Sequence, residues 1–209
     1  MILSDIYNIC ANAHSIVQGI GKESIDVYLF LREQFNKGPI LKNNLFQFVY
    51  RSFYRLDNAG LTPKFKSEYF RMMEECRSSK CLDLRNLTKN LYEMPNLKGQ
   101  NSLQFSFVTK LANTIDDDYP IYDSQVAKVF KFHPPYTYKT MDERLDTYLT
   151  FYENLKKDYY ELLSGNACEA VFASFHEIYP DVDYLMIPRL KILDFFFWSA
   201  GKNNGDKTI

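Results

Sequence analysis

Lys110 and Asp123 are the two residues whose types and spacing could together carry out a reaction. Lys110 lies inside an apolar stretch with helical periodicity, and Asp123 comes thirteen residues later, at the predicted start of the next helix. Residues 116–122 between them can reverse the chain direction, because extended residues span up to about 3.3–3.6 Å each. Tyr119 precedes Pro120 and should therefore be extended rather than helical. The sequence thus predicts that the second helix returns Asp123 to the neighbourhood of Lys110.

Each of the two residues also has a purely structural interpretation. The apolar residues of 103–115 form one helical stripe, and Lys110 lies about 110° from its centre at about 100° per residue. A lysine at such an edge usually covers apolar surface with its stem and keeps its ammonium group in water. An aspartate directly before a helix is a good N-cap, because its carboxylate accepts hydrogen bonds from free backbone amides. Each residue alone is explained in this way, and only the pair favours chemistry.

A lysine and a carboxylate that share a site could cleave an N-glycosidic bond. This cleavage builds positive charge on the sugar, which a nearby carboxylate stabilises. A lysine amine can attack the same carbon and form a Schiff base, which permits strand cleavage. The amine must first be desolvated, so that its pKa falls from about 10.4 toward the working pH. An edge position in a chain with 16% aromatic residues could supply that desolvation.

Two short blocks around these residues resemble the helix-hairpin-helix DNA glycosylase superfamily. Phe107-Val108-Thr109-Lys110 resembles the end of the hairpin motif in lysine-bearing enzymes such as the 8-oxoguanine glycosylases. Residues 120–126, PIYDSQV, resemble the proline–hydrophobic–aspartate element that opens the following helix in those enzymes. Residues 46–70 and 189–202 are similar to blocks in bacterial proteins with the 8-oxoguanine-DNA-glycosylase fold.

This resemblance implies an all-α fold with two lobes, formed by a single domain over residues 1–209 with the active-site cleft between the lobes. It implies a DNA glycosylase of base excision repair, with or without AP-lyase activity, that excises an oxidised or modified base flipped from duplex DNA. Lys110 would be the nucleophile and Asp123 the catalytic carboxylate. Aromatic walls usually hold a flipped base, so Tyr122 and Trp198 are the rings expected to bind it. No metal or cofactor is expected, since the cysteines and histidines lack metal-ligand spacing.

The predicted hairpin turn departs from the family pattern. A standard turn reads Leu-Pro-Gly-Val-Gly-like and binds a DNA phosphate through its amides, whereas residues 98–106, KGQNSLQFS, contain one glycine. Ser102, Ser106, the helix-terminal amides and Lys98 are expected to contact the DNA backbone instead. The spacing from lysine to aspartate is also shorter than in the well-known enzymes. An alternative therefore stays open: an inactive glycosylase-fold module that binds DNA or a protein partner, for example in a bacterial defence or mobile-element system.

Charge is unevenly distributed along the chain. The net charge is −1 with a pI near 6.3, which argues against a non-specific nucleic-acid coat. Residues 37–98 nevertheless carry twelve Lys/Arg against six Asp/Glu, which leaves −7 for the remainder. This segment predicts either a local basic face that contacts DNA or a set of solvated helix faces.

The periodicity predicts helices throughout and no strands. The expected helices cover about residues 4–20, 23–35, 44–58, 63–76, 83–92, 102–115, 124–130, 141–163 and a last one from Pro188 whose apolar residues end before Gly201. Thr62 with Pro63 is an N-terminal capping signal, and Gly60 marks the end of the preceding helix. Residues 203–209 are expected to fray.

The remaining composition places the chain in a reducing, aqueous compartment. No apolar run reaches the eighteen residues that a transmembrane helix needs, and no signal peptide opens the chain, so a cytoplasmic protein is expected. The four cysteines are too scattered for a disulfide framework and should be free thiols. Tyr136 and Tyr138 follow His133-Pro134-Pro135 and should be exposed in a loop.

Overall fold

Every regular element in residues 3–203, the part of the chain that the computed structural model describes, is a helix. The α-helices are α1 (Leu3–Cys10), α2 (Ala13–Gln18), α3 (Lys22–Lys37), α4 (Asn44–Phe53), α5 (Pro63–Ser79), α6 (Leu84–Tyr92), α7 (Phe105–Ile115), α8 (Ser124–Val129), α9 (Met141–Ser164), α10 (Glu169–Ile178) and α11 (Arg189–Asn203). Short 3-10 helices follow α4 (η1, Leu56–Asn58), follow α9 (η2, Asn166–Cys168) and precede α11 (η3, Tyr184–Met186). The predicted all-α class is confirmed.

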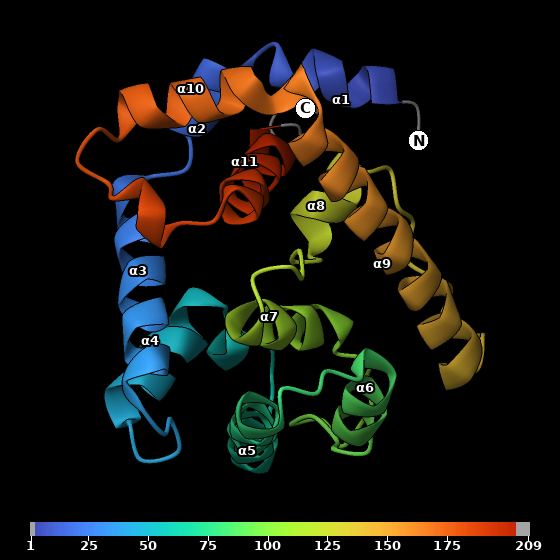
Figure 1. Ribbon diagram of the computed structural model, residues 1–209. Helices are drawn as coiled ribbons and strands as arrows, with labels where there is room; N and C mark the ends of the chain where they lie inside the picture. The colour runs from blue at the N-terminus through green and yellow to red at the C-terminus, as the bar shows by residue number, and fades with distance from the viewer. Residues whose placement is uncertain (1–2, 204–209) are drawn as a thin grey trace.

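The helices form two groups joined along their sides. Helices α4 to α7 lie together in the lower half of Figure 1, whereas α1, α2, α8, α10 and α11 lie above them. Helices α3 and α9 run down opposite sides and connect the two levels (Figure 1). Helix α11 packs against α8 and α2, and its residues 190–201 are all buried except Trp198. This central helix therefore reaches the region where the two groups meet.

Capping side chains set several helix starts, and the cap at Thr62 is the one among them that the sequence predicts. Thr62 accepts a hydrogen bond from the Phe65 amide at 3.2 Å, and α5 begins at the following proline. Asp83 caps α6 in the same way. Thr140 and Glu143 form a reciprocal capping box at the start of α9. These local signals explain why the predicted boundaries of the three helices agree with the structure.

Three predicted helices have different bounds in the structure. Residues 4–20 form two helices, because the Asn12 side chain bonds to the Asn8 carbonyl and the backbone tightens there. The helix expected over 44–58 ends at Phe53, since Arg55 adopts a left-handed conformation with φ of 60°. The helix expected from residue 102 begins at Phe105. Helix α10 was not predicted.

Helix α11 continues through Gly201 because this residue touches α8. A Cβ atom at position 201 would lie 2.3 Å from the Gln125 carbonyl oxygen, so only glycine allows this contact. The helix ends at Asn203, the first residue of the predicted frayed tail, and residues 204–209 of that tail lie outside the described range.

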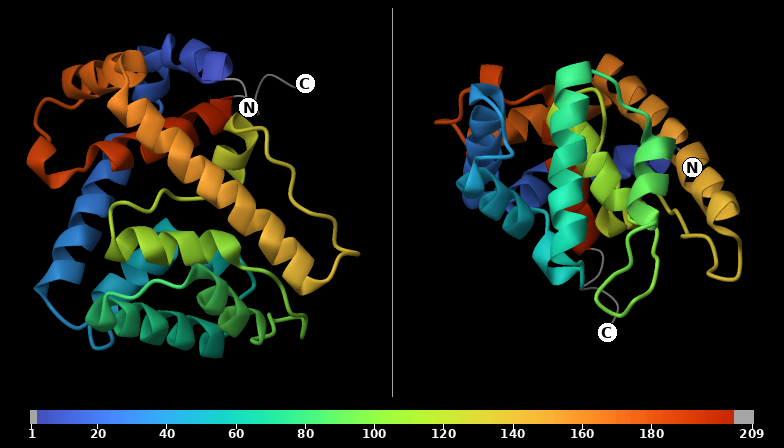
Figure 2. Two further views of the ribbon diagram at one scale, coloured as in Figure 1. Left: turned by 45° about the vertical axis from the view of Figure 1, so that its right-hand side comes forward. Right: turned by 90° about the horizontal axis from the view of Figure 1, so that it is seen from below.

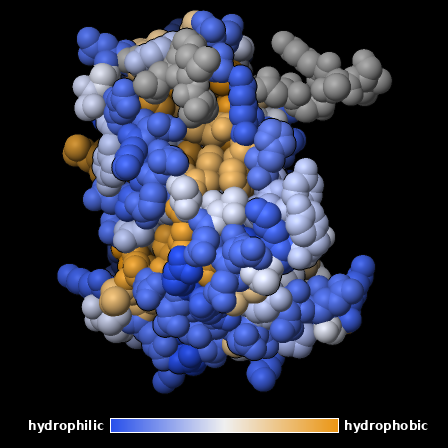
Figure 3. Space-filling model, turned by 90° about the vertical axis from the view of Figure 1, so that its right-hand side faces the viewer, coloured by the Kyte–Doolittle hydropathy of each residue, from blue (hydrophilic) through white to orange (hydrophobic). Residues whose placement is uncertain are grey.

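The surface and the cysteines agree with the composition. All four cysteines are free, and the buried Sγ atoms of Cys10 and Cys168 lie 3.7 Å apart. Within residues 3–203 no helix is both long and apolar enough to cross a bilayer. The face in Figure 3 is mostly hydrophilic, with apolar side chains showing between the polar ones. Tyr136 and Tyr138 are exposed, as predicted, and their rings stack at 5.4 Å.

Candidate functional site

A cavity of about 500 Å³ lies where the two helix groups meet. Its apolar lining consists largely of rings, namely Phe53, Tyr54, Phe105, Tyr122, Tyr148, Phe195 and Trp198. Its charged lining consists of Arg55, Lys110, Asp123, Lys191, Asp194 and Lys202. Lys110 and Asp123, predicted to lie near each other, thus line the same cavity. A volume of this size with aromatic walls and a few polar groups is typical of a small-molecule or base-binding pocket.

Lys110 lies in the middle of α7 and enters the cavity between two rings. Its Nζ atom is 5.0 Å from the centroid of the Phe107 ring and 5.8 Å from that of Tyr54. Burial lowers the pKa of Lys110 from 10.5 to about 8; the charge of Asp123 opposes this change and that of Lys191 supports it. Among the described residues no carboxylate lies within 4 Å of this ammonium group. At pH 7 about 10% of the amine is therefore neutral.

Asp123 is held at the start of α8 by one of its two carboxylate oxygens. Its Oδ1 atom accepts hydrogen bonds from the amides of Gln125 and Val126 at 2.8 and 3.0 Å. Its Oδ2 atom has no hydrogen-bond partner in the described part of the chain. Asp123 is therefore the N-cap that the sequence predicts, and capping leaves one oxygen available toward the cavity.

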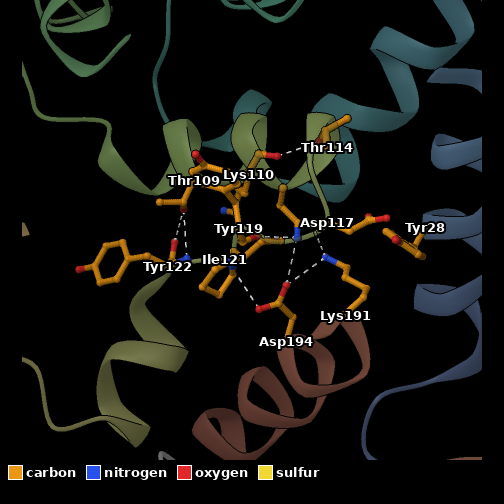
Figure 4. Close-up of polar contacts among 12 residues, drawn as sticks. Tyr28, Thr109, Lys110, Thr114, Asp117, Tyr119, Ile121, Tyr122, Lys191 and Asp194 are labelled. Carbon is orange, nitrogen blue, oxygen red and sulfur yellow. Dashed lines mark hydrogen bonds and ion pairs between the residues drawn. The ribbon is translucent and has the colours of Figure 1, made fainter. Parts of the chain in front are cut away.

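The extended residues 119–122, which lead into Asp123, are held almost entirely by side chains. Asn113 donates to the Tyr119 carbonyl at 2.8 Å, and Tyr152 donates to the Pro120 carbonyl at 2.7 Å. The Ile121 amide donates to Asp194 at 3.0 Å. Figure 4 shows the contact between Ile121 and Asp194, which comes from α11, whereas Asn113 comes from α7.

Thr109 makes the last contact of this set. Its hydroxyl accepts a hydrogen bond from the Tyr122 amide at 3.1 Å (Figure 4). The same hydroxyl lies 3.2 Å from the Tyr122 carbonyl and 3.1 Å from that of Ser106, and it can donate to either. Thr109 precedes Lys110 and Tyr122 precedes Asp123, so this contact joins the direct neighbours of the two predicted catalytic residues.

Lys191 and Asp194 are functional candidates that sequence reasoning missed. Both are nearly fully buried on α11, with their charged atoms 3.7 Å apart, and Lys191 also donates to Asn113 at 3.0 Å. Burial raises the pKa of Asp194 to about 6 and lowers that of Lys191, while each charge opposes the change in the other. A lysine and an aspartate three residues apart within an otherwise apolar run were the available signal.

The two rings predicted to bind a base have different surroundings. Tyr122 is 6% exposed, and its ring packs against Phe105, Tyr148 and other rings at 5.5–5.9 Å. It therefore belongs to a packed wall. Trp198 is partly exposed, and Lys202 lies over its ring at 4.4 Å. Of the two, Trp198 is placed to contact a bound molecule.

The residues predicted to contact the DNA backbone are only partly brought together. Ser106 lines the cavity, whereas Lys98 and Ser102 do not. Lys98 is exposed in a turn whose amides, from residue 96 to residue 100, all donate hydrogen bonds within the chain. These amides are not free to bind a phosphate. Helix α7, by contrast, begins without a side-chain cap, so no capping side chain occupies its first backbone amides.

Ion pairs neutralise much of the basic segment 37–98. The paired cations are Lys37, Arg51, Lys66, Arg71, Arg77, Arg85 and Lys89. Arg55 has no ion pair among the described residues, is exposed, and lines the cavity. The connections 93–104 and 130–140 lie on the same side of the molecule as the C-terminal end of α11 (Figure 2). Arg55 and Lys202 are both exposed cations that line the cavity.

Comparisons with protein-family models, with curated proteins and with solved structures found no match to this chain. Within residues 3–203 no group of three or more His, Cys, Asp or Glu side chains is placed to hold a metal ion. The site therefore offers three features: the largely desolvated amine of Lys110, the Asp123 carboxylate with one oxygen that accepts no hydrogen bond from the described residues, and a cavity lined by rings.

Proposed function

We propose that this chain is a DNA glycosylase of the helix-hairpin-helix type, acting through Lys110 and Asp123 in the cavity between two lobes. The observation that carries the proposal is that both residues line one ring-walled cavity of about 500 Å³. The lobes would be the α4–α7 group and the group around α8 and α11, within a single domain. A planar base fits between aromatic walls, whereas a base stacked in a duplex must first be extruded.

Asp123 and Lys110 would divide the reaction between them. As the bond between C1′ and the base nitrogen breaks, positive charge develops on the sugar, and the free oxygen of Asp123 stabilises it. The neutral amine of Lys110 attacks C1′, and the electron pair of the broken bond leaves with the base, which takes up a proton. The amine then loses a proton as the C1′–O4′ bond opens, giving a protonated Schiff base. Removal of a C2′ proton expels the 3′ phosphate, and water hydrolyses the imine to free Lys110.

Contacts to DNA would come from groups at the cavity rather than from the hairpin turn. Arg55 and Lys202 line the cavity and supply positive charge. The uncapped start of α7 presents backbone amides of the kind that bind phosphate. Ser106 lies in the first turn of the same helix and would add a hydroxyl donor. Lys98 is exposed and would contribute charge at longer range.

A second candidate function is supported by a different observation. The amides of the turn at 96–100 are occupied, and most cations of residues 37–98 are ion-paired. Both features weaken the phosphate contacts through which a glycosylase holds a duplex during base extrusion. They favour a module that keeps the fold without catalysis, and they favour a protein partner over duplex DNA.

Borohydride trapping separates the two candidates. The protein is incubated with duplexes that contain 8-oxoguanine, uracil or an abasic site, and sodium borohydride reduces any Schiff base to a stable adduct. A glycosylase/lyase gives an adduct that disappears in Lys110→Gln and persists in Lys64→Gln, an exposed lysine on α5 away from the cavity. No adduct and no base release on any duplex would favour the binding module.

A further inference from the structure

Residues 120–122 lead into Asp123 without backbone partners of their own. In the described part of the chain, no backbone–backbone hydrogen bond to these residues occurs, and their contacts come from side chains on α7, α9 and α11. A buried, extended segment normally gains such partners from a neighbouring strand. Here the position of the segment, and with it the position of Asp123, depends on a few side chains.

We infer that Thr109 and Asp194 are positioning residues of the proposed site, because they hold residues 121–122 and thereby keep Asp123 in the cavity that Lys110 also lines. The inference rests on the proposed function for its catalytic consequence. The Thr109 hydroxyl binds the Tyr122 amide, and the Asp194 carboxylate binds the Ile121 amide.

Thr109 has the more direct role of the two. It is fully buried, lies one residue before Lys110 and binds the residue before Asp123. The side chain therefore acts as a spacer between the two reacting groups, although it touches neither. Asp194 fixes the preceding residue from the opposite side, on α11, and is itself held by Asn113 and Lys191. Both carboxylate oxygens are engaged in this network, which favours a positioning role.

Loss of the Thr109 hydroxyl should affect base excision and Schiff-base formation unequally. A misplacement of about 1 Å at a reacting group can cost on the order of 100-fold in rate. Base excision needs both Asp123 and Lys110, because the carboxylate stabilises the charge on the sugar. A Schiff base with a preformed abasic site needs the Lys110 amine, which stays on α7 when the spacer is removed. The predicted signature is slow excision with almost unchanged trapping on abasic DNA.

The test compares Thr109→Val, Thr109→Ser and Asp194→Asn with wild type in single-turnover excision and in borohydride trapping on a preformed abasic duplex. We expect Thr109→Val to slow excision by about 10–100-fold and to change abasic trapping by less than about 3-fold. Thr109→Ser retains the hydroxyl and should restore excision to within about 3-fold of wild type. Thr88→Val is the matched control, since the buried Thr88 hydroxyl on α6 binds the Leu84 carbonyl away from the cavity.

Hydrogen exchange provides a readout that does not require activity. Thr109→Val and Asp194→Asn should speed exchange of the Ile121 and Tyr122 amides and of the first amides of α8. Exchange in α6 and α9 should stay at the wild-type rate. Should Asp194→Asn fail to fold because Lys191 loses its partner, the two Thr109 variants still decide the question.

The outcomes are distinct. Slow excision with retained trapping and faster local exchange supports the inference. Equal losses of excision and trapping, or unchanged exchange of Ile121 and Tyr122 in a folded variant, would overturn it. If wild type neither excises a base nor forms an adduct, the proposed function fails, and hydrogen exchange alone then decides whether Thr109 and Asp194 hold the segment.

Discussion

Replacing Lys110 by methionine should make the protein more stable at neutral pH. The structure leaves the Lys110 side chain only partly exposed, with two rings near its ammonium group and no ion pair among the described residues. The resulting pKa of about 8, against 10.5 for an ordinary lysine, corresponds to about 3 kcal/mol of cost for keeping the charge in the folded state. Methionine has a similar length and no charge, so the variant avoids this cost. We expect a gain of about 1–3 kcal/mol in the free energy of unfolding at pH 7.

The stability gained by Lys110→Met should depend on pH, because the pKa of Lys110 differs between the folded and the unfolded chain. Between pH 8 and 10.5 the unfolded chain binds a proton at Lys110 that the folded chain has lost, so the stability of wild type rises with pH in this window. Below pH 8 both states are protonated and the full cost is present. The advantage of Lys110→Met should therefore be largest at pH 7 and shrink steadily as the pH approaches 10.5.

Urea denaturation of both proteins at pH 6, 7, 8, 9 and 10 measures this difference. Lys98→Met is the control, because Lys98 is exposed and its substitution should change stability by less than about 0.5 kcal/mol at every pH. A Lys110→Met variant that is less stable than wild type at pH 7 would refute the reasoning. An advantage that does not change with pH would refute it as well, since it could not arise from the ammonium charge.

Three further predictions concern the cavity and its supports. Arg55→Gly should leave stability within about 1 kcal/mol of wild type, because glycine suits the left-handed backbone at φ of 60°, yet weaken duplex binding and reduce its salt dependence in fluorescence-anisotropy titrations. Gly201→Ala should cost about 2 kcal/mol or more in urea denaturation, since its methyl group would meet the Gln125 carbonyl at 2.3 Å. Trp198 is the only tryptophan, so its emission should change when a duplex carrying 8-oxoguanine or uracil places the flipped base in the cavity, and stay unchanged with an unmodified duplex that leaves the cavity empty.

The elements that were predictable from sequence are those whose boundaries depend on local chemistry. Thr62, Asp83 and Thr140 cap helices through contacts within three residues, and such contacts can be inferred from a one-dimensional pattern. The break at Asn12 depends on a weak competition between side chain and backbone, which the surrounding apolar periodicity hides. Helix α10 was missed because its apolar residues follow a long helix without a distinct starting signal.

The site was predictable only in part for a related reason. Lys110 and Asp123 lie close in sequence, so a short reversing link was enough to infer that they meet. Lys191 and Asp194 are far from both in sequence, and their place in the cavity depends on how α11 packs against α8. Lys98 is near the motif in sequence but does not line the cavity, because its turn is closed on itself. Proximity in sequence therefore predicted the pair and not the cavity around it.

Residues 119–122 gain their contact with α11 only after that helix has been synthesised. Lys110 and Asp123 leave the ribosome well before Asp194, and until α11 packs, the Ile121 amide lacks its acceptor and the cavity lacks one wall. In a nascent or unfolded chain Lys110 is solvated, and with its ordinary pKa of 10.5 only about 0.03% of the amine is neutral at pH 7, against about 10% at a pKa of about 8. The neutral fraction of the Lys110 amine therefore rises about 300-fold as the chain folds around it.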